Sequence, residues 1–275
     1  MIIDFHTHIF PTDVCQHRGD YLRRDPTFAE MYTSPRARVA TAEDLLRSMD
    51  EAGVDKSVIL AFAWRDHELC VRHNDYLLEA AAGSGGRLIP FCMVNPLAGE
   101  RAALEAARCA AGGAPGLGEL RPENQGYDLA GSPAGRLLGD LADRHNFILL
   151  FHVTEPGGRA YPGKGGLPLA QFRRFVAQHP NLKVVGAHFG GGLPWQACAD
   201  GRLGNLYVDT AAMPFLYDAS MISKTAALLD GRVLFGSDYP LVRQERQIEL
   251  IRLAADAAVG AAILGDTAAR LLRKV

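Results

Sequence analysis

The chain has 275 residues, of which 48% are hydrophobic and 22% charged, with a formal net charge of −2 and a pI of about 6.5. This composition is typical of a globular protein and indicates no nucleic-acid or anionic-membrane surface. No apolar run reaches the ~18 to 20 residues of a membrane span, and no signal-peptide pattern precedes the first strand. The five cysteines (15, 70, 92, 109 and 198) are scattered without Cys-x-x-Cys spacing, which favours reduced thiols. We therefore expect a cytoplasmic protein without a nucleic-acid or membrane partner; the composition leaves homo-oligomerisation open.

Short apolar runs alternate with amphipathic segments along the whole chain. The runs expected to form strands are 2–5, 57–62, 88–94, 117–120, 147–151, 183–187, 206–209 and 233–236. The segments expected to form helices are 41–52, 67–82, 101–111, 133–145, 168–178, 219–229, 244–257 and 261–273. Eight strands that are each followed by a crossover predict an α/β fold, a (β/α)8 TIM barrel in a single domain over residues 1–275. A dinucleotide-binding fold is disfavoured, because no Gly-x-Gly-x-x-Gly follows the first strand.

Two connections are longer than usual: residues 11–40 after the first strand and residues 153–167 after the fifth. Both leave the carboxyl ends of strands, where a barrel builds its site. We therefore interpret both as loops that cover a site.

A His-x-His pair, His6 and His8, follows the first apolar run. Alternate residues of a strand point to the same face, so these two imidazoles lie one pleat apart and can chelate a single divalent ion. Pro11 ends the strand, because it cannot donate a ladder hydrogen bond.

Four later strands also place a potential ligand at their carboxyl ends: Glu119, His152, His188 and Asp238. In a barrel these ends converge on one mouth, so residues distant in sequence come together. Imidazole nitrogen and carboxylate oxygen are the ligands of catalytic zinc and related ions. The pattern predicts a divalent metal, most of all Zn²⁺, with Mn²⁺ as the alternative.

Two further residues are candidates for binding the substrate. Arg121 shares a strand face with Glu119 and is suited to a substrate carboxylate. Trp64 leaves the second strand and is a weaker candidate for lining the mouth. Asp4, two residues before His6, is expected on the same face, more as a core hydrogen-bonding group than as one that orients a ligand. The remaining histidines are interpreted as solvated or capping residues, namely His17, His67, His73, His145 and His179.

These motifs together resemble the amidohydrolase superfamily, in the amidohydrolase-related branch that includes aminocarboxymuconate-semialdehyde decarboxylase. The resemblance covers essentially the whole chain and rests on five segments. They are Asp4-Phe5-His6-Thr7-His8, Gly118-Glu119-Leu120-Arg121-Pro122, the histidine ending the fifth strand, Ala187-His188-Phe189-Gly190-Gly191, and Phe235-Gly236-Ser237-Asp238-Tyr239-Pro240.

The resemblance implies a metal held by His6, His8, His152 and Asp238. It also implies that His188 is either a ligand of a second metal or a hydrogen-bond donor to the metal-bound water and substrate. Glu119 departs from the single-metal decarboxylases of the branch, whereas two-metal relatives use a carboxylate there to bridge both ions. A centre of one or two ions is therefore expected, with Glu119 bridging as our hypothesis.

We predict a metal-dependent hydrolase that acts on a small, anionic amide, lactone or ester. Its metal would activate water, and Asp238 would act as general base and then acid. The alternative is a non-oxidative decarboxylase of the same branch. A phosphoesterase is disfavoured by the absence of a basic stripe. A non-catalytic metal-binding scaffold is disfavoured by the intact Asp238.

Overall fold

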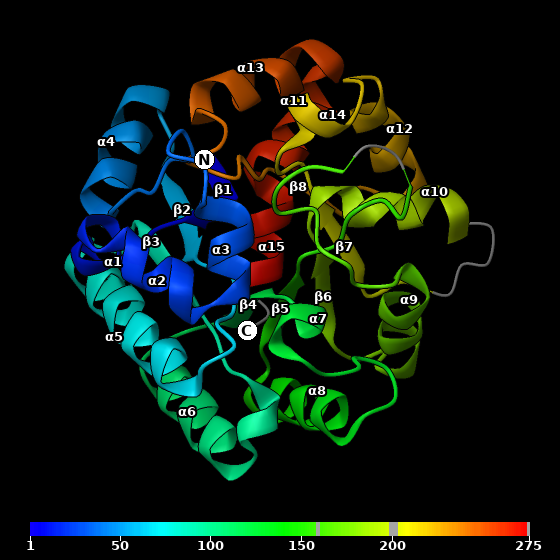
Figure 1. The fold of residues 1–275 in the computed structure, drawn as a ribbon. Coiled ribbons are helices and arrows are strands. Elements are labelled where there is room, and N and C mark those ends of the chain that lie inside the picture. Colours follow the sequence, from blue (N-terminus) through cyan, green and yellow to red (C-terminus); the bar gives the residue numbers. More distant parts are fainter. Residues whose placement is uncertain (158–159, 198–202, 274–275) are drawn as a thin grey trace.

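Eight parallel strands form one sheet, ordered β1 to β8 as in the sequence. The computed structural model describes residues 1–157, 160–197 and 203–273, so Cys198 lies outside the described residues. The strands are β1 Ile3–His8, β2 Lys56–Leu60, β3 Leu88–Cys92, β4 Gly116–Leu120, β5 Ile148–Phe151, β6 Lys183–Gly186, β7 Leu206–Asp209 and β8 Val233–Leu234. The first and last strands meet where Phe5 N donates to Phe235 O at 2.7 Å and His8 N donates to Tyr239 O at 2.7 Å. The predicted TIM barrel is confirmed (Figure 1).

Helices surround the strands in an outer ring (Figure 1). The long ones are α4 Ala42–Ala52, α5 His67–Gly83, α6 Glu100–Ala111, α8 Pro133–His145, α9 Leu169–Gln178, α12 Met221–Leu228 and α13 Gln244–Ala254. The short ones are α1 Thr12–Gln16, α2 Arg18–Arg24, α3 Pro26–Tyr32, α7 Pro122–Gln125, α10 Leu193–Ala197, α11 Met213–Leu216, α14 Ala257–Ala261 and α15 Thr267–Leu272. Short turns of other helical type are η1 Pro96–Ala98, η2 His188–Gly192 and η4 Ala262–Asp266. Over the described part of the chain, no helix is long and apolar enough to cross a membrane.

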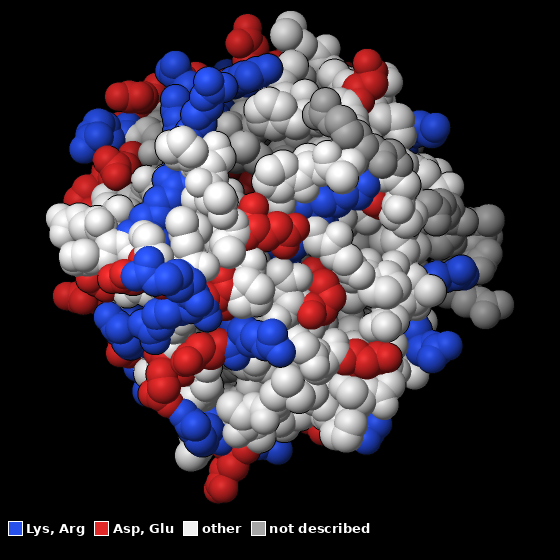
Figure 2. All heavy atoms as spheres, viewed as in Figure 1, with Lys and Arg blue, Asp and Glu red and all other residues white. Residues whose placement is uncertain are grey.

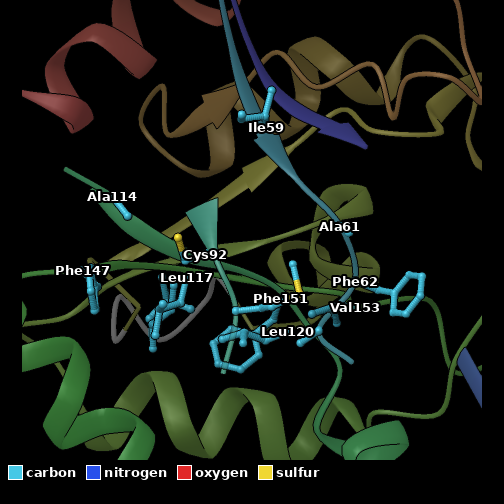
Figure 3. Packing of buried hydrophobic residues seen from close by; sticks show 14 of the residues in the cluster. Ile59, Ala61, Phe62, Cys92, Ala114, Leu117, Leu120, Phe147, Phe151 and Val153 are labelled. Carbon is cyan, nitrogen blue, oxygen red and sulfur yellow. The ribbon is translucent and has the colours of Figure 1, made fainter. Parts of the chain in front are cut away.

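The alternation of side chains along each strand divides the apolar residues into two clusters. On β5, Ile148 and Leu150 join an inner cluster that Leu271 of α15 also contacts. Leu149 and Phe151 join the larger cluster between the strands and the helices, shown close up in Figure 3. The period-two pattern expected of a barrel strand therefore holds, and the next inward position after Leu150 is His152.

The register of β1 against β2 shifts between Asp4 and Thr7. A shift of one residue turns the following side chains to the opposite face. The spacing of Asp4 and His6 predicts a shared face, but the shift places Asp4 on the opposite face of the strand from His6. Its carboxylate instead links β1 to the segment after β8.

The connection 11–40 is not a plain loop, because it contains α1, α2 and α3. Asp25 starts α3 by accepting hydrogen bonds from Thr27 N at 2.8 Å and Phe28 N at 3.0 Å, and Pro26 occupies the first helical position. Phe28 and Tyr32 are buried among aromatic rings, so packing stabilises a helix too short to form alone. The connection 153–167 has no helix or strand among its described residues.

Replacing Asp4 tests its role in closing the barrel. Its carboxylate accepts hydrogen bonds from His6 N at 3.2 Å, Ser237 N at 3.0 Å, Ser237 Oγ at 2.6 Å and Gln244 Nε2 at 2.8 Å. Asp4→Ala leaves these buried donors without an acceptor, so we expect a loss of about 3 kcal/mol in the free energy of unfolding. Urea denaturation measures this loss. Asp50→Ala removes an exposed carboxylate and serves as the control; equal stability of both variants would contradict the role of Asp4.

Candidate metal centre

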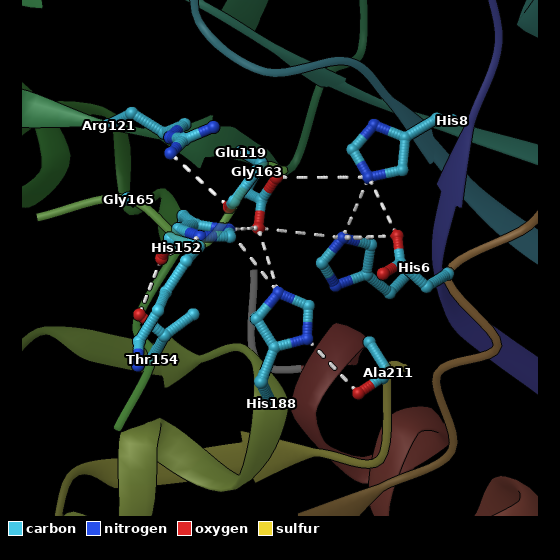
Figure 4. A network of polar contacts seen from close by, with 12 residues as sticks. His6, His8, Glu119, Arg121, His152, Thr154, Gly163, Gly165, His188 and Ala211 are labelled. Carbon is cyan, nitrogen blue, oxygen red and sulfur yellow. Dashed lines mark hydrogen bonds and ion pairs between the residues drawn. The ribbon is translucent and has the colours of Figure 1, made fainter. Parts of the chain in front are cut away.

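His6 and His8 of β1 and Glu119 of β4 converge at the carboxyl end of the barrel (Figure 4), and Asp238 joins them from the segment after β8. His6 Nε2 and His8 Nε2 are 3.0 Å apart, and Asp238 Oδ1 lies 3.1 Å from His8 Nε2. Glu119 Oε1 is 3.7 Å from His6 Nε2, and its Oε2 is 3.8 Å from His8 Nε2. His6, His8 and Glu119 together form a buried group that could hold a metal ion.

Glu119 also belongs to a second buried group of potential ligands, with His152 and His188. Glu119 Oε1 lies 2.8 Å from His152 Nδ1 and 3.7 Å from His188 Nε2. The two imidazole nitrogens are 3.3 Å apart. The structure thus brings together all six residues expected from the sequence to bind metal, with His152 beside Glu119 and His188.

Hydrogen bonds on the outer side fix how these imidazoles face the centre. His6 Nδ1 lies 2.8 Å from Asp209 Oδ2, and His188 Nδ1 lies 3.0 Å from the carbonyl oxygen of Ala211. Such outer partners orient metal-binding histidines and set the ring tautomer. Asp209 ends β7 and is completely buried, and we expect this carboxylate to position His6 through the hydrogen bond to Nδ1.

The electrostatics of the centre favour positive charge. Burial alone would lower the pKa of His6, but Asp209, Glu119 and Asp238 outweigh it and raise the pKa to about 10. Burial would raise the pKa of Asp238, but hydrogen bonding from His8 and the nearby His6 lower it to about 2. The pKa of Glu119 is held well below its usual range, against the effect of burial, by His152 and His6. Buried carboxylates are therefore kept ionised by histidines, and a divalent cation could replace those protons.

The glycines beside His188 allow close backbone packing. A Cβ atom on Gly191 would lie 2.5 Å from the carbonyl oxygen of Thr154, and this residue has a φ of +59°. His188 itself has a positive φ of 55°, as does Asp238 at 63°. Non-glycine residues rarely adopt this region, and they do so mostly where function requires it.

A cavity of about 270 Å³ opens above the centre. Its polar side consists of His8, Glu119, His152, Thr154, His188 and Asp238, and its other walls of Met31, Tyr161, Pro162, Gly163, Ala212, Phe215, Leu216 and Leu241. Phe215 and Leu241 are each 58% exposed at the rim. The cavity therefore has the size and mixed lining of a small-molecule site.

A second lobe of about 120 Å³ adjoins this cavity and shares His8, Met31 and Asp238 with it. Tyr32 and Arg38 line this lobe. Arg38 is exposed, and positive and negative side chains are interspersed over the face shown in Figure 2. Arg38 is thus a positive side chain at the edge of the cavity, and the sequence pattern does not indicate it because it lies in no recognisable motif.

The structure does not place Arg121 or Trp64 among the residues that line the main cavity. Arg121 is completely buried, with its guanidinium near Glu30, Glu123 and the carbonyl oxygen of Gly163. A direct contact with a substrate carboxylate is not supported in this arrangement.

Trp64 is 1% exposed and stacks on Phe28. Its Nε1 donates to His73 Nδ1 at 3.0 Å, and His73 Nε2 lies 2.9 Å from the carbonyl oxygen of Ile9. Trp64 is therefore a core residue, and the prediction that His73 is solvated or capping is wrong. An aromatic ring at a strand end indicates a core as readily as a binding surface.

The fold and the centre together define a class of protein: a metal-dependent enzyme built on a (β/α)8 barrel, with buried histidines and carboxylates at its mouth. The amidohydrolase family model matches residues 3–274, and the chain belongs to this family. The comparison with curated proteins gave no match.

Several solved structures share the fold at low sequence identity. The 5-carboxyvanillate decarboxylase from Sphingomonas paucimobilis is 18% identical with a TM-score of 0.78, covering 99% of this chain and 98% of the other. The corresponding enzyme from Novosphingobium aromaticivorans, with bound manganese, is 17% identical with a TM-score of 0.79, covering 99% and 97%. The 2,6-dihydroxybenzoate decarboxylase from Rhizobium is 16% identical with a TM-score of 0.74, covering 99% and 98%.

These findings contradict the prediction of a metal-dependent hydrolase of amides, lactones or esters. The activities printed for these neighbours are decarboxylations, the reaction that the sequence left as the alternative. A divalent metal is supported by the buried ligands, but zinc in particular is not, since the Novosphingobium neighbour holds manganese. The ligand motifs are shared by several reactions, and this is why they indicate a metal and not the chemistry.

Replacing Asp209 tests the outer hydrogen bond to His6. Asp209→Asn removes the charge that holds the imidazole, so we expect metal affinity to fall about 10- to 100-fold. Competition with a chromophoric chelator measures the affinity. Asp230→Asn, at an exposed turn with a φ of 50°, is the matched control. Unchanged affinity in Asp209→Asn would show that this carboxylate does not position a ligand.

Proposed function

We propose that this protein is a metal-dependent, non-oxidative decarboxylase of a small aromatic or similarly unsaturated carboxylate. The observation that carries the proposal is a buried histidine–carboxylate centre that opens on a small cavity with largely apolar outer walls. The activities of the structural neighbours support the same reaction class. The substrate is a small molecule, as expected for a cavity of about 270 Å³.

His6, His8 and Asp238, three of the four residues that the resemblance implies, would hold the principal ion, Mn²⁺ or Zn²⁺. The fourth, His152, lies in the group with Glu119 and His188. The ligand atoms of His6, His8 and Asp238 lie 3.0 to 3.8 Å from one another, which suits imidazole and carboxylate bonds of about 2.0 to 2.2 Å to one ion. When bound, the ion would hold the substrate carboxylate and neutralise its charge.

The apolar wall would orient the rest of the substrate. Met31, Phe215, Leu216 and Leu241 line the same cavity as the metal-binding side chains. A flat ring or diene would lie against these side chains, with its carboxylate toward the polar side. Holding the substrate in one orientation lowers the entropy that must be lost to reach the transition state.

Decarboxylation requires a proton at the carbon that bears the carboxylate. That carbon gains a C–H bond, its bond to the carboxylate breaks, the electron pair returns to the unsaturated system, and CO₂ leaves. We assign the proton transfer to Asp238, which borders both lobes of the cavity. Because this carboxylate is ionised, it would first take a proton from water in the cavity and then deliver it to the carbon, and the hydroxide left behind balances the charge of the carboxylate that is lost. A positioned acid–base group contributes about 10²- to 10⁴-fold to a rate.

Metal removal and substitution of Asp238 test this function. The assay measures CO₂ release from hydroxybenzoates and muconate-type acids. Chelation should abolish release, and Mn²⁺ or Zn²⁺ should restore it.

Asp238→Asn should lower kcat at least ~10²-fold, with an unchanged circular dichroism spectrum because asparagine tolerates a positive φ. Turnover in metal-free protein, or ester and lactone cleavage without any CO₂ release, would overturn the proposal.

Arg38 would bind an additional anionic or hydroxyl group of the substrate from the second lobe. Arg38→Gln should raise KM about 10-fold or more, since a hydrogen bond to a charged group contributes about 1.5 to 3 kcal/mol. Arg36→Gln is the matched control, because Arg36 is exposed in the same connection and is not among the residues that line either lobe. Equal KM values for the two variants would contradict this role.

A further inference from the structure

Arg121, immediately after β4, is a completely buried arginine. Among the described residues, it belongs to neither group of potential metal ligands and does not line the main cavity. Its Nη2 lies 3.4 Å from Glu30 Oε2 and 3.4 Å from the carbonyl oxygen of Gly163, and its Nε lies 3.5 Å from Glu123 Oε1. The guanidinium therefore connects the end of β4 to α3, to α7 and to the connection 153–167.

Two of these partners belong to walls of the cavity. Glu30 directly precedes Met31 in α3, and Gly163 directly follows Pro162 in the connection. Met31, Pro162 and Gly163 all line the cavity. A Cβ atom on Gly163 would lie 3.3 Å from Met31 Cγ, so the two walls are in contact. Arg121 contacts both of them from outside the cavity, and its position can therefore set the distance between them.

The charge of Arg121 holds together groups that would otherwise separate. Glu30 Oε1 accepts from Gly165 N at 3.4 Å, and Glu123 Oε1 accepts from Gly166 N at 3.5 Å. These separations, like those to the guanidinium, are long beside the ~2.7 to 2.9 Å of a strong charge-assisted hydrogen bond. Each contact is therefore weak, and the set depends on the positive charge that both carboxylates share. Without that charge, the two carboxylates would repel each other, and the backbone that they bind would lose its fixed partners.

His152 holds the same stretch of backbone one residue further along. The carbonyl oxygen of Lys164 lies 3.0 Å from His152 Nε2, and the preceding carbonyl is the one that Arg121 contacts. A Cβ atom on Gly165 would lie 2.6 Å from Arg121 Nη2 and 3.0 Å from His152 Cδ2, so this backbone packs directly against both side chains (Figure 4). Loss of Arg121 would therefore leave the attachment at Lys164 in place and loosen the wall at Gly163.

We propose that Arg121 is a positioning residue that fixes the separation of the cavity walls at Met31 and Gly163, and thereby limits the size of the substrate. It acts through Glu30 and the Gly163 carbonyl and does not touch the substrate. The proposal rests on the proposed function for the choice of substrate, a small carboxylate with one ring or diene. A cavity of about 270 Å³ with fixed walls selects against bulky substituents on that ring, because closely packed walls do not yield.

Amide hydrogen exchange of the metal-loaded, full-length protein without substrate tests how the wall is held. Arg121→Met should speed exchange in a peptide spanning residues 163–166 about 10-fold or more, because the segment opens more often. Arg121→Lys keeps the charge but not the planar fork, so its exchange should be intermediate. Arg136→Met, at an exposed arginine of α8, is the matched control and should exchange like the wild type. Unchanged exchange in Arg121→Met, which a direct contact with the substrate would predict, overturns the proposal.

Substrate selectivity tests the consequence for the cavity. Rates of CO₂ release are compared for 2-hydroxybenzoate and its 5-methoxy derivative. Arg121→Met should raise KM for the smaller acid about 10-fold with a smaller change in kcat, and should narrow the preference for it by a similar factor. Its metal content should equal that of the wild type. A lower Tm with the wild-type preference would show a purely structural role and overturn the proposal.

A second variant decides the matter if Arg121→Met fails to fold. Glu30→Gln removes the charge of a partly exposed partner and should change exchange and selectivity in the same direction by a smaller amount. Glu249→Gln, at an exposed position of α13, is its matched control. If neither Glu30→Gln nor Arg121→Lys differs from the wild type, the proposal is wrong.

The outcome can be separated from that of the proposed reaction. Isothermal titration calorimetry with the same two acids measures the preference even where no CO₂ is released. Faster exchange and a narrowed binding preference without CO₂ release would support the positioning role and refute the decarboxylase. CO₂ release with unchanged exchange would do the reverse.

Discussion

The burial of ionised carboxylates beside imidazoles is the interaction on which this centre depends. Glu119 and Asp209 are 1% and 0% exposed, and Asp238 is 8% exposed. Carboxylates so buried are stable as anions only with positive charge or hydrogen-bond donors beside them. The barrel supplies this by bringing histidines from three other strand ends to the same place. A centre of this kind is therefore a binding site for cations as a consequence of its own electrostatics.

The barrel must hold these groups at fixed separations. The junction of β1 and β8 is the part of the sheet where few hydrogen bonds are available to do so. β8 is only two residues long, so few ladder hydrogen bonds close the sheet. Asp4 compensates by joining the bulge of β1 to Ser237 and Gln244. Ser237 immediately precedes Asp238, and His6 N donates to the same Asp4 carboxylate. Closure of the barrel and placement of two ligands thus depend on one buried group.

The sequence predicts the architecture well because it depends on short-range periodicity. Each strand is an apolar run with a clear end. The side chains at those ends converge in a barrel, whatever conformation the connecting loops adopt. His152 and His188 could be placed in this way. The bulge in β1 could not, since no residue type marks it, and it moved Asp4 to the other face.

The positions of other residues depend on contacts between segments that are distant in the sequence, and these could not be predicted. Trp64 is buried because α3 packs against it, and α3 is too short to show helical periodicity. The sequence could not place Arg38, because its position in the same lobe as Asp238 depends on the path of an irregular connection. The reaction class is the hardest to predict, because the metal ligands do not determine it. The walls that discriminate between reactions, such as Met31 and Phe215, belong to the segments between the strands.

The contact between the connection 153–167 and the centre has a consequence for how this enzyme can evolve. His152 is held by the carbonyl oxygen of Lys164, and Thr154 Oγ1 donates to the same oxygen at 2.5 Å. A backbone carbonyl is present whatever the side chain. Residues of this connection can therefore change identity, and with them the shape of the cavity at Tyr161 and Pro162, while the imidazole keeps its orientation. New substrate preferences can arise here by drift without first disabling the metal site.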